Sequence, residues 1–176
     1  MYSQAKYSRQ YVGGIEALEA LLAHEKAAAV PTILIAAHQL LLGDLLSLSG
    51  DGAGAKAHFQ EVLDETLPEL RRQPGNALLL NVLAVAYCGL GDHVQATKHA
   101  NLLVSLVPVT SDALDGAAWE NTRARVWARF GEKERAIPAI ARVLTLPAGL
   151  LTPAILRMDP DFDKLRGDPR FEALLK

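Results

Sequence analysis

A short phrase of turn-forming residues recurs three times along the chain and constrains the fold more than any other feature. Each copy has a glycine, an acidic residue directly after it, and an alanine five residues after the glycine: Gly50, Asp51 and Ala55; Gly91, Asp92 and Ala96; Gly131, Glu132 and Ala136. The glycines lie 41 and 40 residues apart. Self-similarity at such a period indicates a stacked array of similar units.

The phrase and the composition together predict helices joined by tight turns. Glycine is favoured just past a helix end, and a carboxylate at the start of the next helix can accept free backbone N–H groups. Half of the residues are hydrophobic but only 6% are aromatic, and Ala and Leu, which are strong helix formers, dominate. We therefore expect helices near 14–28, 31–49, 52–72, 76–90, 92–107, 111–130 and 132–146. Asn76 and Ser111 are the expected N-caps, and Pro68 is expected to kink or end its helix.

Alignment of the three units on their glycines shows further agreement. The shared positions are a small residue, a bulky residue, a leucine and a closing proline: Gly43, Ala84 and Ala124; Leu46, Tyr87 and Trp127; Leu63, Leu103 and Leu144; Pro68, Pro108 and Pro147. Small residues let two helices of a hairpin approach closely. Because one hairpin cannot bury its apolar faces alone, neighbouring hairpins are expected to stack.

These positions resemble the tetratricopeptide repeat family. The resemblance implies an all-α fold, an α-solenoid of about three helix hairpins in a single domain, 1–176. The repeats would span approximately 31–73, 76–108 and 111–147, with an N-terminal helix before them and a C-terminal cap at 150–176. Each unit is about six residues longer than the usual 34, and Leu46 stands where an aromatic is expected. Another kind of α-solenoid is the alternative.

The tail adds a second resemblance, to the closing segment of tetratricopeptide domains in multidomain bacterial signalling proteins, where the domain follows a kinase, a nucleotide cyclase or a winged-helix regulator. The matching residues are Asp159, Pro160, Phe162, Leu165, Arg166, Asp168, Pro169, Arg170, Phe171 and Leu174. Asp168 reads as an N-cap with Pro169 at the first helical position. The resemblance implies that this chain is the C-terminal module of a longer protein.

Patterns that carry catalysis or cofactor binding are incomplete in this sequence. Asp159, Asp161 and Asp163 alternate as in a calcium loop, but Lys164 stands where glycine is needed. The glycine-rich stretch 50–56 follows a predicted helix and lacks the closing Gly-Lys-Ser/Thr of a phosphate-binding loop. The five histidines are scattered, and Cys88 lies in an apolar stretch. We therefore expect no enzyme, no cofactor and no metal site.

Charge and hydropathy narrow the range of partners. The formal net charge of -2 with no basic run argues against nucleic-acid binding. Two uncharged runs, 27–43 and 73–91, contain proline and polar residues, so buried helices are favoured over membrane insertion. The first eleven residues lack the apolar stretch of a signal peptide, and the single cysteine does not place the protein in an oxidising compartment. A cytoplasmic location is slightly favoured.

The remaining candidate site is a concave groove, which the tetratricopeptide resemblance implies along the first helices of the hairpins. Its candidate peptide-binding residues are Asn81, Val85, Asn121, Arg125 and Arg129. An asparagine side chain can form hydrogen bonds with a peptide backbone. The two arginines lie one helical turn apart, so together they can hold a carboxylate. The alternative is that Arg123, Arg125 and Arg129 only make a helix surface soluble, pairing with Glu132 or Glu134. Asp44 departs from the pattern of arrays that clamp a terminal carboxylate.

We therefore expect a noncatalytic scaffold that binds a protein or peptide segment. The alternative is an oligomerisation or regulatory domain that acts through self-association or through an attached effector. An apolar stripe near the N-terminus bears on this choice: Ile15, Leu18, Leu21 and Leu22. It must pack on the first repeat or on another chain.

Overall fold

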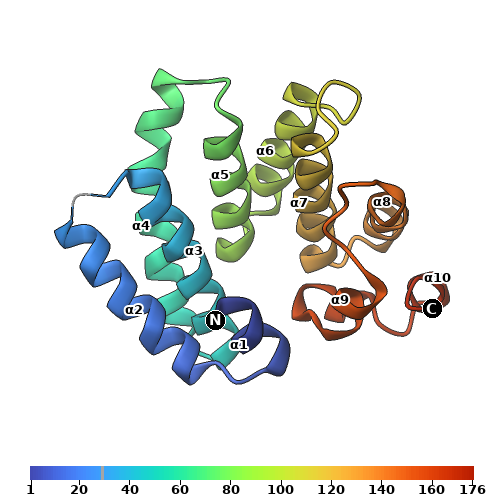
Figure 1. The fold of residues 1–176 in the computed structure, drawn as a ribbon, viewed down its shortest axis with the longest axis horizontal. Coiled ribbons are helices and arrows are strands. Elements are labelled where there is room, and N and C mark those ends of the chain that lie inside the picture. Colours follow the sequence, from blue (N-terminus) through green and yellow to red (C-terminus); the bar gives the residue numbers. More distant parts are fainter. Residues whose placement is uncertain (29) are drawn as a thin grey trace. The chain divides into compact units, whose positions relative to one another are not determined.

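The structure is a computed structural model that describes residues 1–28 and 30–176. All regular secondary structure in these ranges is helical, which confirms the all-α prediction (Figure 1). The chain divides into two compact units, Met1–Asp92 and His93–Lys176. The division falls at the second turn phrase, between the two helices expected to form the second repeat. The arrangement of three repeats in one solenoid therefore stays a prediction.

The helices of the first unit are α1 to α5, and those of the second unit are α6 to α10 with one 3-10 helix, η1. In the first unit they span Tyr2–Ser8, Val12–Ala27, Thr32–Ser49, Gly52–Arg72 and Ala77–Leu90. In the second unit α6, α7 and α8 span His93–Leu106, Asp115–Phe130 and Lys133–Thr145, and α9, η1 and α10 span Pro153–Met158, Pro160–Leu165 and Pro169–Ala173.

The three turn glycines adopt the left-handed conformation that their position predicts. Gly50, Gly91 and Gly131 have φ angles of 99°, 80° and 77°. Asp51 caps α4 by accepting a hydrogen bond from the Gly54 N–H at 2.9 Å. The phrase therefore works as a local stop and start signal for helices.

Of three predictions about helix ends, one is confirmed, one is wrong, and one, for Pro68, is limited to a kink within the helix. Asn76 caps α5 through the Leu79 N–H. The prediction of Ser111 as an N-cap is wrong, because α7 begins at Asp115 and the Asp112 carboxylate accepts the N–H groups at its start. The helix α4 does not end at Pro68, but continues to Arg72.

The core of the first unit is built around Phe59 of α4. Its side chain is fully buried and packs between α3 and α5. A Cβ placed on Gly43 of α3 would lie 2.8 Å from this ring, and one on Gly89 of α5 would lie 2.4 Å from it. The small residue at position 43 therefore serves the close approach that the alignment predicts.

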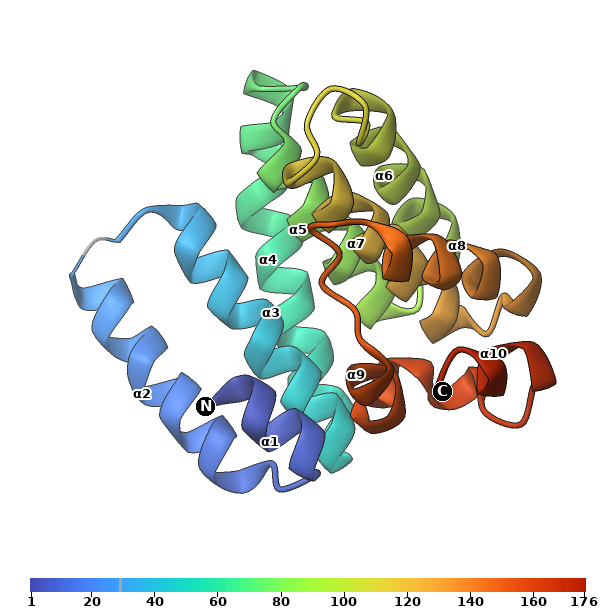
Figure 2. The ribbon, with the colours of Figure 1, turned by 45° about the vertical axis from the view of Figure 1, so that its right-hand side comes forward.

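The N-terminal apolar stripe packs within its own unit. Leu18 and Leu22 of α2 are buried in a cluster with Leu42 and Leu45 of α3. Figures 1 and 2 show α2 beside α3. Of the two alternatives for this stripe, packing on the first hairpin is the one observed. The preceding helix α1 was not predicted from the sequence, and it also contacts α2 and α3.

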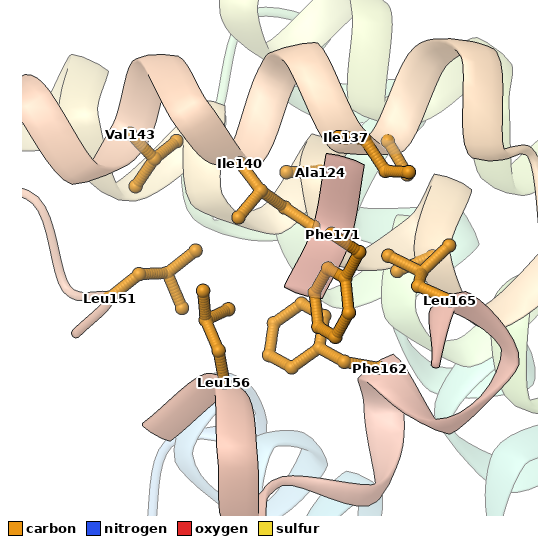
Figure 3. Close-up of a cluster of buried hydrophobic side chains, with 11 residues drawn as sticks. Ala124, Ile137, Ile140, Val143, Leu151, Leu156, Phe162, Leu165 and Phe171 are labelled. Carbon is orange, nitrogen blue, oxygen red and sulfur yellow. The ribbon is translucent and has the colours of Figure 1, made fainter. Parts of the chain in front are cut away.

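The core of the second unit lies between α7, α8 and the C-terminal segment. Figure 3 shows Phe162 of η1 and Phe171 of α10 side by side in this cluster, with Ile137 and Ile140 of α8 beside them. The two phenylalanine rings have centroids 6.2 Å apart and are fully buried. The expected C-terminal cap is thus an integral part of this core, and Asp168 caps α10 as predicted.

Among the described residues, one helix is long and apolar enough to cross a membrane by length and composition alone. It is α3, with a mean hydropathy of 1.5 over 18 residues. It contains the buried polar residues Gln39 and Asp44 and contacts α2, α4 and α5. Because the core helix of a folded bundle meets the same criterion, this packing explains its composition.

Candidate functional site

The predicted groove residues lie on two helices, one in each unit. Asn81 and Val85 are half-buried on α5 of the first unit. Asn121, Arg125 and Arg129 follow one another at intervals of four residues along one face of α7 in the second unit. The structure brings together the residues within each set.

Arg125 binds two carboxylates of its own chain. Its Nη1 donates to Asp159 Oδ2 and to Asp161 Oδ2, both at 2.6 Å. The guanidinium also lies over the Phe162 ring, 5.1 Å from the centroid. Burial acts to lower the pKa of Arg125, but the nearby Asp161 and Asp159 outweigh it and raise this pKa above its ordinary value. The arginine therefore remains charged and fixes η1 on α7.

The neighbouring groove residues support the same contact. Asn121 Oδ1 accepts a hydrogen bond from Arg125 Nε at 3.2 Å. Arg129 Nη1 lies 3.9 Å from Asp161 Oδ1. Arg125 thus holds two carboxylates of the C-terminal segment, and Arg129 lies close to one of them. The binding of a separate peptide on this face stays a prediction.

The structure also shows which groups the α7 arginines pair with, which bears on the alternative that they only make the helix surface soluble. Arg123 pairs with Glu120 at 2.5 Å and stacks on the Trp127 ring, 4.9 Å from its centroid. Glu132 pairs with Arg135 and His93, and Glu134 pairs with Arg170. The three α7 arginines thus have structural contacts of their own in the second unit, different from those that the alternative proposed.

The first unit shows a similar contact at the equivalent position. Asp44 lies six residues before its turn glycine, as do Val85 and Arg125. Its Oδ2 accepts a hydrogen bond from the Tyr2 hydroxyl at 2.6 Å and lies 3.1 Å from Lys6 Nζ. The side chains of Lys6 and Asp44 are only 5% and 7% exposed. A short helix of the same chain, α1, is therefore bound to α3 through a buried ion pair.

The third equivalent position lies on a partly open face of α5. Leu78, Asn81 and Val85 are spaced three and four residues apart, so they share one face of the helix. Leu78 is 55% exposed. Val85 packs against the core of the first unit and is only half-buried. This face offers an apolar rim with an amide at its centre.

A pocket of about 330 Å³ opens at the N-terminal end of α5, where Leu78 lies. It is formed where α3 begins, α4 ends and α5 begins, and Leu78 is among its lining residues. Glu69, which lines the pocket, pairs with Arg72 at 2.7 Å. Through Leu78 the pocket adjoins the open face of α5.

The structure shows no arrangement of metal ligands among the described residues. No group of three or more His, Cys, Asp or Glu side chains in 1–28 and 30–176 lies close enough together to hold a metal ion. Asp159 caps η1 through the Asp161 N–H and binds Arg125. Two carboxylates of the calcium-like pattern thus serve to dock the C-terminal segment.

Sequence reasoning missed the internal partners of these faces. The sequence predicted no partner on α7 for Asp159 and Asp161, and no role for Lys6. The available signal was charge complementarity, because the chain carries an acidic pair near one end and a basic residue near the other. That signal is weak without knowledge of which helix each segment meets.

No protein-family model, curated protein or solved structure matches this chain. The class of the protein is therefore stated from its fold and its contacts. It is an all-α protein in which first helices of helix hairpins bind short segments of the same chain.

Proposed function

We propose that the protein is a noncatalytic scaffold of the tetratricopeptide type, which binds a protein or peptide segment on the first helices of its hairpins. Nucleic acid, membrane insertion and cofactors have no part in this proposal. Binding would use a preformed helical surface, which lowers the ordering cost of association.

The observation that supports the proposal is that equivalent positions on two helices, six residues before a turn glycine, both bind a segment of the chain. Asp44 on α3 and Arg125 on α7 each bind a short helical segment through an ion pair of low exposure. Such a surface recognises a segment by one charged contact and surrounding apolar packing. The same position on α5, Val85, is where a segment of another protein would bind.

The properties of the α5 face suggest what such a segment would present. Leu78 offers exposed apolar surface, and the adjoining pocket can receive an apolar side chain of the partner. The Asn81 amide can both donate and accept hydrogen bonds. We therefore propose that the partner segment presents an apolar anchor together with polar groups of its backbone or side chains.

Site-specific photo-crosslinking tests this proposal. A benzophenone amino acid replaces Asn81 in the full chain, and a second chain carries it at Lys56, an exposed position on α4. After irradiation in native lysate, we expect a crosslinked partner from position 81 but not from position 56. The same crosslink should disappear in a Leu78→Asp chain. Equal crosslinking from both positions, or none from position 81, would count against the α5 face.

Self-association is the second candidate, and the surface of α6 supports it. Val94, Leu102 and Leu106 are 73%, 45% and 43% exposed and lie on one side of this helix. Exposed apolar side chains gathered in this way are typical of contact surfaces. Light scattering over a range of concentrations would show a rising mass, and Leu102→Lys should abolish it. A constant monomer mass would exclude this candidate.

A further inference from the structure

We propose that the Asp44 face of α3 is a docking site for a basic segment of a partner protein, and that α1 is a displaceable internal segment that covers it. The inference rests on the proposed function, because it assigns the regulation of one of the same binding faces. It adds the chemistry of the partner segment and the part of this chain that competes with it.

The chemistry of the face requires a basic ligand. Asp44 is a low-exposure carboxylate beside the apolar cluster of Leu42 and Leu45. Its Oδ2 is bound by Lys6 Nζ at 3.1 Å and by the Tyr2 hydroxyl at 2.6 Å. A desolvated carboxylate is stable only when cations or hydrogen-bond donors compensate for lost water. A segment that replaces α1 must therefore replace this cation and this donor.

Several features make α1 easy to release. It has seven residues, of which only Ala5 and Lys6 are buried. A helix this short is marginal in water, and a buried ion pair adds little net stability because both charges lose hydration. Arg9, which follows it, has a φ of 57°, an unfavourable conformation for a residue other than glycine. Undocking frees this residue from that conformation.

The C-terminal segment is held much more firmly by comparison. It also bears charges that meet a first helix, but its Phe162, Leu165 and Phe171 are fully buried in the core of the second unit. Undocking it would remove three fully buried side chains from that core, whereas α1 contributes only Ala5 and the partly buried Tyr2 to the cluster of the first unit. Of the two internal segments, α1 is therefore the one that can exchange with a partner.

Two adjacent glycines of α2 provide a matched test of docking. A Cβ on Gly14 would lie 2.7 Å from Ala5 Cβ and 2.9 Å from Leu45 Cδ1, whereas a Cβ on Gly13 meets nothing within 4 Å. In Gly14→Ala we expect amide exchange of residues 2–8 to become about tenfold faster or more, the size of effect that an overpacked contact produces. In Gly13→Ala it should stay unchanged. Equal exchange in the two variants, or α1 exchange no faster than that of α3 in the wild type, would overturn the proposal.

A peptide added in trans tests the ligand chemistry. The probe is a fluorescent peptide with the sequence of residues 1–10, and the receptor is the full chain with Lys6→Glu, whose own α1 is released by repulsion from Asp44. A short tether gives an effective concentration of millimolar order, so a docked α1 implies a Kd of about 0.1 mM or tighter for the free peptide. Lys6→Gln provides a second receptor with neutral α1, and circular dichroism checks that both receptors fold.

The expected result is binding to both Lys6 variants, with weaker binding to the wild-type chain and none by a peptide that carries Lys6→Glu. The absence of binding at about 1 mM, or equal binding by the two peptides, would overturn the proposal. Because this assay uses the Asp44 face alone, its failure is distinct from a failure of the crosslinking experiment on α5.

Discussion

At the scale of single residues, the contact between Phe59 and its two glycines decides how closely the helices of the first unit pack. The ring fills the space that the absent Cβ atoms of Gly43 and Gly89 leave open. Protein interiors are close-packed, so the ring has little room to move away from an added methyl group. Helix propensity, which disfavours glycine inside a helix, is overridden here by packing.

Alanine at position 89 should therefore be destabilising although alanine favours helices. We expect Gly89→Ala to lower the free energy of unfolding by about 1–3 kcal/mol, because its Cβ would lie 2.4 Å from the Phe59 ring. Gly52→Ala, also in a helix and with open space at its Cβ, is the control and should change stability by less than about 0.5 kcal/mol. Urea denaturation measures both. Equal stabilities of the two variants would contradict this account of the core.

Arg125 holds two carboxylates of its own chain, a structural contact that the sequence did not predict. We expect Arg125→Met to destabilise the second unit by about 2–4 kcal/mol, because it leaves the carboxylates of Asp159 and Asp161, 1% and 8% exposed, without their cation. The loss should be smaller than for a fully buried pair, because the Arg125 side chain is 21% exposed. Arg135→Met, which removes a 58% exposed arginine, should cost less than about 1 kcal/mol. Thermal unfolding compares them, and equal losses would argue against a structural role for Arg125.

At the scale of elements, the last helix is fixed by a local cap and by a charge network. Asp168 accepts hydrogen bonds from the backbone and side chain of Arg170, and Arg170 also binds Glu134 of α8. The side-chain hydrogen bond from Arg170 is the main cause that lowers the pKa of Asp168, from 3.8 to about 2. This network links α10 to α8, the helices that carry Phe171 and Ile137 of the core in Figure 3.

The lowered pKa predicts an acid-sensitive cap. A carboxylate with a pKa lowered by folding stabilises the folded state fully above its ordinary value, and the contribution is lost as pH falls through the lowered one. We expect Asp168 to titrate near pH 2 and the contribution to fade between about pH 4 and pH 2. In Arg170→Met the midpoint should move toward 3.8. Carboxyl chemical shifts measured by NMR test this, and an unchanged midpoint would rule out Arg170 as the cause.

At the scale of the whole molecule, the division into two compact units predicts regional stability. Phe171 lies in the second unit, fully buried between elements that belong to it. We expect Phe171→Ala to cost about 3–5 kcal/mol and to accelerate amide exchange in His93–Lys176 more than in Met1–Asp92. Phe171→Leu should show the same regional pattern with a smaller effect. A uniform acceleration along the chain would mean that the two units unfold as one.

Much of the local structure could be predicted from the sequence because its causes are local. A glycine with a left-handed φ, a carboxylate that caps the next helix and an apolar stretch of helical period each act within a few residues. The prediction failed where local signals compete. Ser111 and Asp112 are both capable caps, and α1 has too few apolar residues to give a periodic pattern.

The sequence by itself determined the all-helical class and the turns between helices. Only the tertiary structure decided which charged groups meet on α3 and α7. Arg125 binds carboxylates 34 and 36 residues away, and Asp44 binds a hydroxyl 42 residues away. Contacts over such separations depend on how whole helices pack, because charge alone does not specify a partner. Packing therefore decided that both charged faces receive segments of the chain itself.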